Sequence, residues 1–394
     1  MPPHVVIAGA GIGGLTAALA LQRSGARVTL LERAALIEDA GAGLQLSPNA
    51  SRVLAGLGVL DRLRGAVGPV QLHVRRARDA ATLALLPLGP QAERRWGAPM
   101  LVAHRADLQQ ALLETVALAP GIELRAGVAL TGYAASDQDV RIACGGQDAA
   151  IAADALIGAD GLNSQVREQL SPRGKTLYSG RTAWRALIEA DQAPAFARTL
   201  ETSLWLGAKA HLVHYPVRGG ALVNVVAIVG DGWRGPASAD LWAEDGDAAI
   251  VAARFASWHI SARALIAAAP AWRKWPLFDR PPLARWSAGR IAVLGDAAHP
   301  MLPFLAQGAA QAIEDAAALG RAFAGAADVA AALAAYSASR APRAARVQQA
   351  SRRQGHIYHL SGPGAVARDL ALAWLGPQKL AARSDWLYGF DASL

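Results

Sequence analysis

The chain has 394 residues, 53% of them hydrophobic and 18% charged, and a formal net charge of +8. This composition excludes an intrinsically disordered chain, and the length allows two or three structural units. The basic residues stand in short scattered groups without a nucleic-acid-binding signature, so an anionic small molecule explains the charge better than nucleic acid does. Cys144 is the only cysteine, which excludes an intrachain disulfide and a cysteine-based metal cage. No unbroken run of about 20 apolar residues predicts a membrane span, and a cytoplasmic location is expected.

The N-terminal segment predicts a βαβ unit. A short β-rich run covers residues 4–8, and apolar residues recur at helical spacing from Leu15 to Leu21. Gly25 stands where a helix C-cap glycine belongs, and a second strand over residues 27–31 ends at Glu32. Strand, helix and parallel strand in this order indicate an α/β, Rossmann-like domain.

Three glycines follow the first predicted strand. Gly9, Gly11 and Gly14 form the pattern G-x-G-x-x-G at the start of the predicted helix. Gly9 permits the tight turn, Gly11 lets the backbone approach a pyrophosphate, and Gly14 lets the helix pack on the strand. Glu32 stands near the spacing at which an acid binds ribose hydroxyls. The pattern predicts a dinucleotide site but does not separate FAD from NAD.

Further along the chain, two stretches are rich in alternating β-branched and aromatic residues, 70–88 and 178–229, and predict an antiparallel sheet. The first fold resumes between and after them, with a helix over 107–116 and strands over 155–157 and 290–294. An Ala-rich helix over 307–323 follows, and then a helix over 329–353 that Asp328 caps. The tail, with Trp374, Trp386 and Tyr388, is expected to fold back onto the body because aromatic side chains favour burial.

Two later motifs separate FAD from NAD by resemblance. The first, Gly158-Ala159-Asp160-Gly161 with Ser164, Val166 and Arg167, resembles the Asp-Gly motif of flavoprotein monooxygenases. The second resembles their Gly-Asp motif; it runs from Gly295-Asp296-Ala297-Ala298-His299-Pro300 through Pro303 and Gly308 to Glu314-Asp315. The likeness extends to Gly41-Ala42-Gly43, Pro48-Asn49, His104-Arg105-Ala106-Asp107-Leu108, Ala183-Trp184-Arg185 and Trp275-Pro276. The chain thus resembles the class A single-component FAD-dependent aromatic monooxygenases, which include salicylate, 3-hydroxybenzoate and 6-hydroxynicotinate hydroxylases.

This resemblance implies a p-hydroxybenzoate hydroxylase-like fold: a Rossmann-like FAD-binding domain, an inserted antiparallel-sheet substrate domain and a C-terminal helical segment. The FAD-binding domain is expected to be discontinuous over 1–70, 100–177 and 278–345. The substrate domain is expected over 71–99 and 178–277, and the C-terminal segment over 346–394. The oligomeric state is open, with a homodimer as one alternative.

The resemblance also implies the cofactors: bound FAD, NADH or NADPH as transient electron donor, and O2, which forms a C4a-hydroperoxyflavin. Asp296 is expected to accept a hydrogen bond from a ribityl hydroxyl, and the helix entered near Gly308 to aim its amides at the flavin pyrimidine. The full set of expected cofactor contacts is Gly9, Gly11, Gly14, Glu32, Arg33, Arg105, Asp160, Asp296, Pro303, Gly308 and Ala309.

On the substrate side, His211 and Tyr215 lie in a predicted strand and share one face, while His214 points away. Two histidines on opposite faces do not converge on a metal, so no metal site is expected. In the relatives, histidine and tyrosine at this spacing line the substrate pocket. We therefore assign His211 as the base that takes a phenol proton and Tyr215 as a substrate hydrogen-bonding group.

Two departures from the relatives leave the substrate open. Some hydroxylases of N-heterocyclic acids have a histidine where this chain has Gln45, and some 3-hydroxybenzoate enzymes have a glutamine where it has Pro303. Both residues are assigned to the substrate site, and Arg181 and Arg185 are candidates for binding a carboxylate. The predicted function is hydroxylation of a small aromatic or heteroaromatic acid. The alternatives are a flavin epoxidase or monooxygenase on a non-phenolic substrate, an NAD-dependent dehydrogenase, and a flavin-binding protein without turnover.

Overall fold

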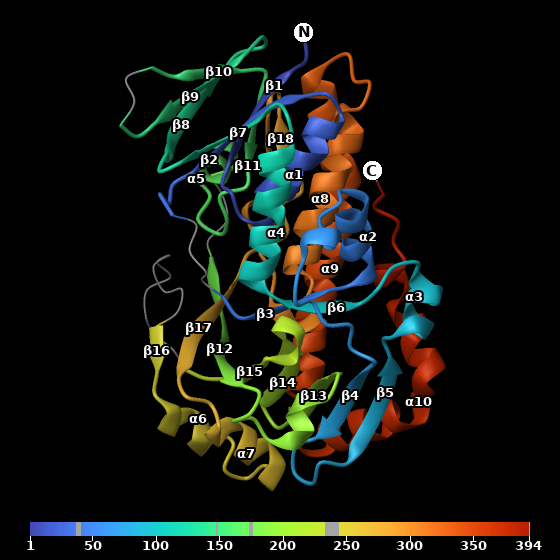
Figure 1. Ribbon diagram of the computed structural model, residues 1–394. Coiled ribbons are helices and arrows are strands. Elements are labelled where there is room, and N and C mark those ends of the chain that lie inside the picture. Colours follow the sequence, from blue (N-terminus) through green and yellow to red (C-terminus); the bar gives the residue numbers. More distant parts are fainter. Residues whose placement is uncertain (37–40, 147–148, 173–175, 233–243, 394) are drawn as a thin grey trace.

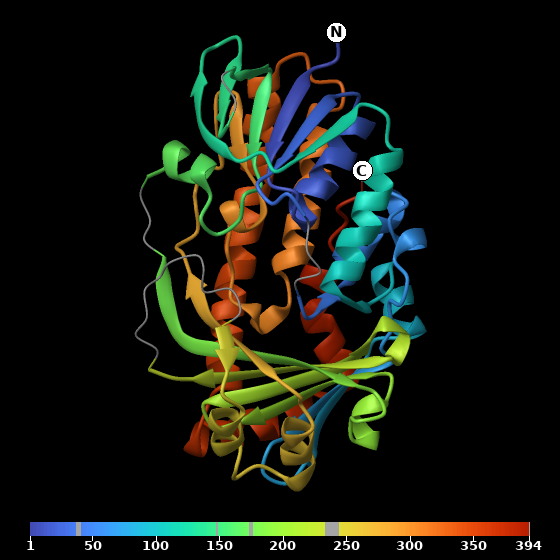
Figure 2. The same ribbon diagram turned by 60° about the vertical axis from the view of Figure 1, so that its left-hand side comes forward.

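A computed structural model describes residues 1–36, 41–146, 149–172, 176–232 and 244–393. Two sheets dominate it, one in the upper half of Figure 1 among long helices and one across the lower half, where Figure 2 shows it nearly edge-on. The chain passes between the two halves several times, so neither is built from one continuous segment.

The upper sheet has six strands in the order β18-β19-β11-β1-β2-β7. All neighbours are parallel except β18 and β19. Its strands are β1 (His4–Ala8), β2 (Arg27–Glu32), β7 (Ile122–Ala126), β11 (Ala155–Gly158), β18 (Ser287–Ala288) and β19 (Ile291–Val293). The predicted strands over 4–8 and 27–32 therefore form as expected. Every residue of β1 is buried, as is typical of a parallel strand with helices on both faces.

Helices with many small residues pack on this sheet and on one another. They are α1 (Ile12–Arg23), α2 (Pro48–Gly56), α4 (Arg105–Leu118), α5 (Gln165–Leu170), α8 (Gly308–Phe323) and α9 (Val329–Tyr358). Helices α1 and α8 approach so closely that a Cβ on Gly320 would lie 2.9 Å from the carbonyl oxygen of Ala20. Asp328 caps α9 by accepting hydrogen bonds from the amides of Ala330 and Ala331. This helix continues past residue 345, where the sequence predicted a domain boundary.

Two small sheets extend the upper half. One consists of β8 (Leu130–Ala135), β9 (Val140–Cys144) and β10 (Ile151–Ala153), and the other of β3 (Gly43–Leu46) and β6 (Leu101–His104). The second connects the halves, because β6 leads directly into α4 and β3 reaches the lower sheet. Short 3-10 turns occur at Leu60–Arg62, Ala195–Arg198 and Arg218–Gly220.

The lower sheet has eight strands in the order β16-β17-β12-β15-β14-β13-β4-β5. They are β4 (Gln71–Arg76), β5 (Thr82–Pro87), β12 (Leu177–Glu189), β13 (Glu201–Gly207), β14 (Ala210–Val217), β15 (Leu222–Gly230), β16 (Glu244–Gly246) and β17 (Trp272–Asp279). The predicted antiparallel sheet forms, with one exception: β13 and β4 are parallel. β4 and β5 form a hairpin that comes early in the chain and joins the sheet at the edge next to β13.

One face of the lower sheet is covered by α6 (Ala248–Arg254) and α7 (Ile260–Ala267), with Trp205, Phe255 and Trp272 in the core between them. The other face looks toward the upper half, as Figure 2 shows. The space between this face and the six-stranded sheet is where the candidate site forms.

The C-terminal helix α10 (Gly362–Tyr388) bends at Gly376 and Pro377 and packs beside β5 and α3 (Pro90–Trp96). Tyr388 meets the edge of Trp96, as expected for a tail folded back onto the body. Trp374 differs from that expectation: it is 76% exposed, because its face of α10 points to solvent. None of the described helices is long and apolar enough to cross a membrane.

Candidate active site

Three strands of the upper sheet end side by side. Ala8 of β1 pairs with Gly158 of β11, and Gly158 pairs in turn with Val293 of β19, all in parallel register. Each predicted motif begins where one of these strands ends, so the three motifs meet along the carboxyl edge of the sheet. That edge is where open parallel sheets bind their ligands.

The glycine-rich turn has the geometry that its sequence predicts. Gly9 has φ +106°, and a Cβ there would lie 2.5 Å from the carbonyl oxygen of Ala159. A Cβ on Gly14 would lie 1.9 Å from the carbonyl oxygen of Gly9, so only glycine lets α1 start so close to β1. Beside Gly11, by contrast, no atom of the described residues other than its chain neighbours lies within 4 Å of a Cβ position. The turn therefore has open space at the helix N-terminus, as a bound pyrophosphate requires.

Glu32 lies next to this turn at the end of β2. Its Oε2 accepts a hydrogen bond from the amide of Ala10 at 2.8 Å, and its Oε1 accepts one from Ala34 at 2.9 Å. These bonds fix the carboxylate over the glycine-rich turn, where a ribose can reach it. Arg33 is exposed beside it.

Asp160 is the acidic residue of the Gly158-Ala159-Asp160-Gly161 motif and caps a helix. Its Oδ2 accepts hydrogen bonds from the amides of Gln165 and Val166 at the start of α5. Its Oδ1 is enclosed and has no partner among the described residues. Burial raises the pKa of this carboxyl, which the hydrogen bonds offset in part. Asp160 therefore has a structural task here and one oxygen left for a ligand.

Arg167 joins the second motif to the third. Its Nη1 donates to the carbonyl oxygens of Ala297 and Ala298 at 2.9 and 3.1 Å, and its side chain is buried. Burial, together with the nearby Arg280, lowers its pKa to about 10, so it stays charged at neutral pH. The sequence resemblance included this arginine but did not predict the bridge between the motifs.

Asp315 of α8 also anchors the turn that carries Asp296. Asp315 Oδ2 accepts hydrogen bonds from the amide of Gly295 at 3.0 Å and from Nε2 of His299 at 2.5 Å. Its Oδ1 accepts one from Nε of Arg340 on α9 at 2.7 Å. His299 is thus a structural residue, and Asp296 itself remains exposed at the sheet edge.

A buried polar network continues from Asp315 to Glu314. Arg340 and Arg343 both donate to the Glu314 carboxylate, and so does the amide of Asn49 on α2, at 2.6 Å. Burial alone would raise the pKa of Glu314, but these cations and hydrogen bonds lower it. The two arginines were missed from the sequence, because a helix with many arginines gives no sign of which ones point inward.

The entrance to α8 lies next to this network. A 3-10 turn, η6 (Pro303–Leu305), leads through Ala306 to Gly308, which begins α8. Ala306 has φ +52°, a left-handed conformation that favours glycine. Pro303, Gly308 and Ala309 are each partly exposed. In the part of the chain that the structure describes, nothing beyond the chain neighbours and the helix's own backbone lies within 4 Å of a Cβ position on Gly308. The helix N-terminus is therefore open to a flat group, and the cradle as a whole fits FAD.

The lower sheet faces this cradle with His211, Val213 and Tyr215 of β14. His211 and Tyr215 lie on the same face, as strand alternation predicts, because His211 packs against Phe304 of η6 and Tyr215 against Gly43 of β3. His214 points to the opposite face. The two predicted substrate residues are four positions apart on one strand, about 13 Å of backbone.

Arg185 of β12 lies on this face near Tyr215. Its guanidinium stacks over Trp275, with Cζ 5.0 Å from the ring centroid, and its enclosed Nε has no hydrogen-bond partner among the described residues. Burial lowers its pKa, Tyr215 raises it and Arg105 lowers it further. A half-buried cation that has no counter-ion among the described residues is a candidate anion site. Arg181, the other candidate, already donates to His359 at 3.0 Å.

The β3 strand covers the Tyr215 end of this face. The amide of Gly43 donates to Oδ1 of Asn224 at 2.8 Å, and a Cβ on Gly43 would lie 2.7 Å from Tyr215. Gln45 is two residues on and therefore faces the same way as Gly43. Burial raises the pKa of Tyr215 above its usual value, so its hydroxyl stays protonated. Asn224 was missed from the sequence, which gave no motif around it.

Arg105, the first residue of α4, is exposed. A Cβ on Gly41 would lie 3.0 Å from the Arg105 Cβ and 3.3 Å from its Cδ, so the two residues are in contact. It is thus near the β3 edge of the site.

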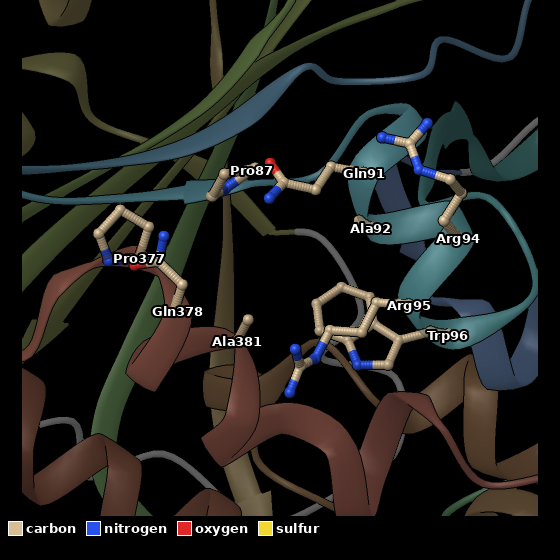
Figure 3. Close-up of a pocket in the computed structure, with 9 residues that line it drawn as sticks. All are labelled: Pro87, Gln91, Ala92, Arg94, Arg95, Trp96, Pro377, Gln378 and Ala381. Carbon is tan, nitrogen blue, oxygen red and sulfur yellow. The ribbon is translucent and has the colours of Figure 1, made fainter.

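A separate groove of about 330 Å³ lies between α3 and α10, where Figure 3 shows Arg95 and Trp96 facing Gln378 and Ala381. None of the predicted site residues lines it.

Comparison with known proteins agrees with this geometry. Residues 3–351 match the family described as FAD binding domain. A 3-amino-4-hydroxybenzoate 2-monooxygenase of Streptomyces platensis is 39% identical, over 99% of this chain and 97% of the relative. A 3-hydroxybenzoate 6-hydroxylase of Polaromonas naphthalenivorans is 36% identical, over 98% of this chain and 96% of the relative. The crystal structure of Klebsiella pneumoniae HpxO complexed with FAD and uric acid superimposes with a TM-score of 0.85 at 26% identity, covering 98% and 96% of the two chains.

The chain therefore belongs to the FAD binding domain family. Within it, the chain is an FAD-dependent monooxygenase of the aromatic hydroxylase class. The predicted resemblance, fold class and flavin cofactor are confirmed, and the NAD-dependent dehydrogenase alternative is wrong.

Proposed function

We propose that this enzyme hydroxylates a small aromatic acid that carries a ring hydroxyl, with NADH or NADPH as electron donor and O2 as oxidant. The observation that carries the proposal is the half-buried Arg185 side chain, whose enclosed Nε has no hydrogen-bond partner and whose charge has no counter-ion among the described residues. It lies on a sheet face that also bears His211 and Tyr215. The named relatives that act on aminohydroxybenzoate and hydroxybenzoate support the same class of substrate.

We assign the cofactor contacts from the cradle. The amides around Gly11 would bind the pyrophosphate, Glu32 the ribose of the adenosine and Asp296 a ribityl hydroxyl. The N-terminus of α8 at Gly308 and Ala309 would meet the flavin ring, with Pro303 beside it. Arg33, Arg105 and Asp160 complete the proposed set. FAD, when bound and reduced, supplies the oxygen chemistry, and the protein orients the ring and excludes water.

The substrate ring would lie between the polar groups, over Val226, the partly exposed member of an apolar floor. Ala183, Val226 and Ile228 form this floor, and Leu302 and Phe304 pack on it from the cradle side. Arg185 would bind the substrate carboxylate, because pairing with an anion relieves the cost of a half-buried, unpaired cation. Tyr215 and Gln45 would bind a polar substituent near the carboxylate end of the substrate. His211 would bind the ring hydroxyl at the opposite end.

The cytoplasmic location expected from the sequence belongs to the same proposal. Cys144 is buried and unpaired, so the fold does not depend on an oxidising compartment.

A panel of aromatic acids tests the function. Each compound is assayed for NADH and NADPH oxidation and for hydroxylated product in the same sample. We expect acids with a ring hydroxyl to stimulate oxidation with near-stoichiometric product, and Arg185→Met to raise KM for the acids but not for their amides. Stimulation by alicyclic alkenes, with none by phenolic acids, would instead support an epoxidase.

A further inference from the structure

Three side chains that are distant in sequence form a hydrogen-bonded chain ending at His211. Nε of Arg181 on β12 donates to Nδ1 of His359 at 3.0 Å. Nε2 of His359, at the end of α9, lies 2.8 Å from Nδ1 of His211 on β14. His211 is only 3% exposed, and Phe304 and Tyr358 pack against its ring.

The direction of this chain follows from its first member. A guanidinium can only donate, so Nδ1 of His359 must accept and carries no proton. A neutral imidazole has one N–H group, and in His359 this group is therefore on Nε2. It donates to Nδ1 of His211, which must accept in turn. The single proton of a neutral His211 is then on Nε2.

Both imidazoles are neutral in this environment. Burial lowers the pKa of His359 to about 4, with further lowering from Arg181, His356 and Arg368. Burial also holds the pKa of His211 well below its usual value, and His359 and Arg181 act in the same direction. The charged groups that shift the pKa of either ring, among the described residues, are basic side chains, and none is a carboxylate that would favour an imidazolium.

The other ring nitrogen of His211, Nε2, is available for a hydrogen bond to a bound molecule. Among the described residues, Nε2 of His211 has no hydrogen-bond partner, although Nδ1 does. It is on the sheet face that bears the substrate floor, beside the turn that carries Pro303 and Phe304.

We propose that His211 presents a fixed Nε2–H donor to an anionic oxygen of the aromatic substrate, and that Arg181 and His359 are positioning residues that set this tautomer. The inference rests on the proposed function, and it changes the base role predicted for His211 from the sequence. A ring nitrogen that already carries a proton does not take another from a phenol. The phenol proton leaves to solvent as the substrate binds, and the donor stabilises the oxygen anion that remains.

The tautomer can be measured without substrate. Holoenzyme with ¹⁵N-labelled histidine is examined by NMR, and His211→Gln and His359→Gln assign the two ring signals. We expect both residues to show a protonated Nε2 and an unprotonated Nδ1. A protonated Nδ1 on His211 would overturn the proposal, whether or not the enzyme hydroxylates any compound tried.

The positioning role has its own matched pair of variants. Arg181→Met removes the first donor, and we expect His211 to become a mixture of tautomers. Arg353→Met removes an exposed arginine from the helix that ends at His359, and the His211 signals should not change. An unchanged tautomer in Arg181→Met would remove Arg181 from the chain. If that variant does not fold, the wild-type measurement still decides the tautomer.

The donor role is tested by substrate binding to the oxidised holoenzyme. Glutamine keeps an N–H donor but cannot act as a base, whereas leucine has neither function. We expect His211→Gln to bind a hydroxybenzoate within a few-fold of wild type and His211→Leu to bind about 10- to 100-fold more weakly, the usual loss for a hydrogen bond to a charged group. Equal binding by the two variants, or loss of hydroxylation in His211→Gln with binding intact, would contradict the donor role.

The same variants identify the oxygen that His211 meets. With the methyl ether of the hydroxybenzoate the phenolate is absent, and with its methyl ester the carboxylate is absent. We expect the difference between His211→Gln and His211→Leu to vanish with the ether and persist with the ester. The reverse pattern would show that His211 meets the carboxylate and would overturn the assignment of that group to Arg185.

Discussion

Arg340 offers the sharpest test of how the cofactor cradle is supported. It is 2% exposed and donates to Asp315 Oδ1 at 2.7 Å, to Glu314 Oε2 at 2.6 Å and to Gln311 Oε1 at 2.9 Å. Arg340→Met would leave two buried carboxylates with fewer partners. Breaking a buried ion pair from one side costs about 3–5 kcal/mol. For a chain of this length, at about 0.8 kcal/mol per degree, the melting temperature should fall by about 4–6 °C at neutral pH.

The loss of stability in Arg340→Met should depend on pH. Burial alone would raise the pKa values of Glu314 and Asp315, but the surrounding cations outweigh it and lower both. The stabilisation that Arg340 provides is therefore fully present above the usual carboxyl values of about 4.5 and 3.8 and is lost as the pH falls through the lowered values. The gap in melting temperature between wild type and variant should narrow below about pH 4.

Calorimetry on the wild type, Arg340→Met and Arg346→Met would measure this effect. Arg346 is exposed on the same helix and stacks on Trp386, so its variant controls for the loss of one positive charge. FAD affinity should also fall in Arg340→Met, since Asp315 holds the turn that carries Asp296. A melting temperature as high as that of Arg346→Met would refute the role of Arg340.

Three further substitutions probe separate parts of the site. In Gly11→Ala the new methyl group has no atom of another described residue within 4 Å, the two chain neighbours apart, so we expect an apoprotein melting temperature near wild type. FAD affinity should nevertheless fall by about tenfold or more, and normal affinity would speak against the pyrophosphate contact. In Gly43→Ala the new methyl group would lie 2.7 Å from Tyr215 and from Asn224, so KM for the aromatic acid should rise about tenfold with FAD content intact. An unchanged KM would show that β3 does not border the substrate. Burial lowers the pKa of His214 to about 3, so below about pH 6.5 this histidine binds a proton in the unfolded chain but not in the folded chain. The stability of the wild type therefore decreases as the pH is lowered from about 6.5. His214→Leu avoids this loss: its melting temperature relative to wild type should increase from pH 7 to pH 5 with activity unchanged, and a decrease would contradict the neutral, buried histidine.

Local patterns in the sequence predicted much of the upper half. The strand over 4–8, the glycine-rich turn and the strand ending at Glu32 depend on neighbouring residues, and they form as expected. The face shared by His211 and Tyr215 was equally predictable, because a strand repeats every two residues. The family motifs added Asp160 and Asp296. The parallel pairing of β1, β11 and β19 brings these two residues to the same edge of the sheet.

Pairings between distant segments could not be predicted in this way. Gln71 and Glu201 pair across 130 positions, and nothing in either segment reveals that β4 and β13 run parallel. His211 and His359 are 148 positions apart, and the tautomer of the first depends on the second. A residue type can therefore suggest a base, whereas the protonation state of that residue is set by its partners in space.

Isotope labelling of the product tests the central claim most directly. The enzyme is supplied with ¹⁸O2, NADH or NADPH and the hydroxylated aromatic acid that stimulates oxidation best, and the product is analysed by mass spectrometry. The account predicts one ¹⁸O atom in the new ring hydroxyl and near-equal amounts of product formed and electron donor consumed. A product whose new oxygen comes from water, or oxidation of the donor without any hydroxylated product from any aromatic acid, would contradict it.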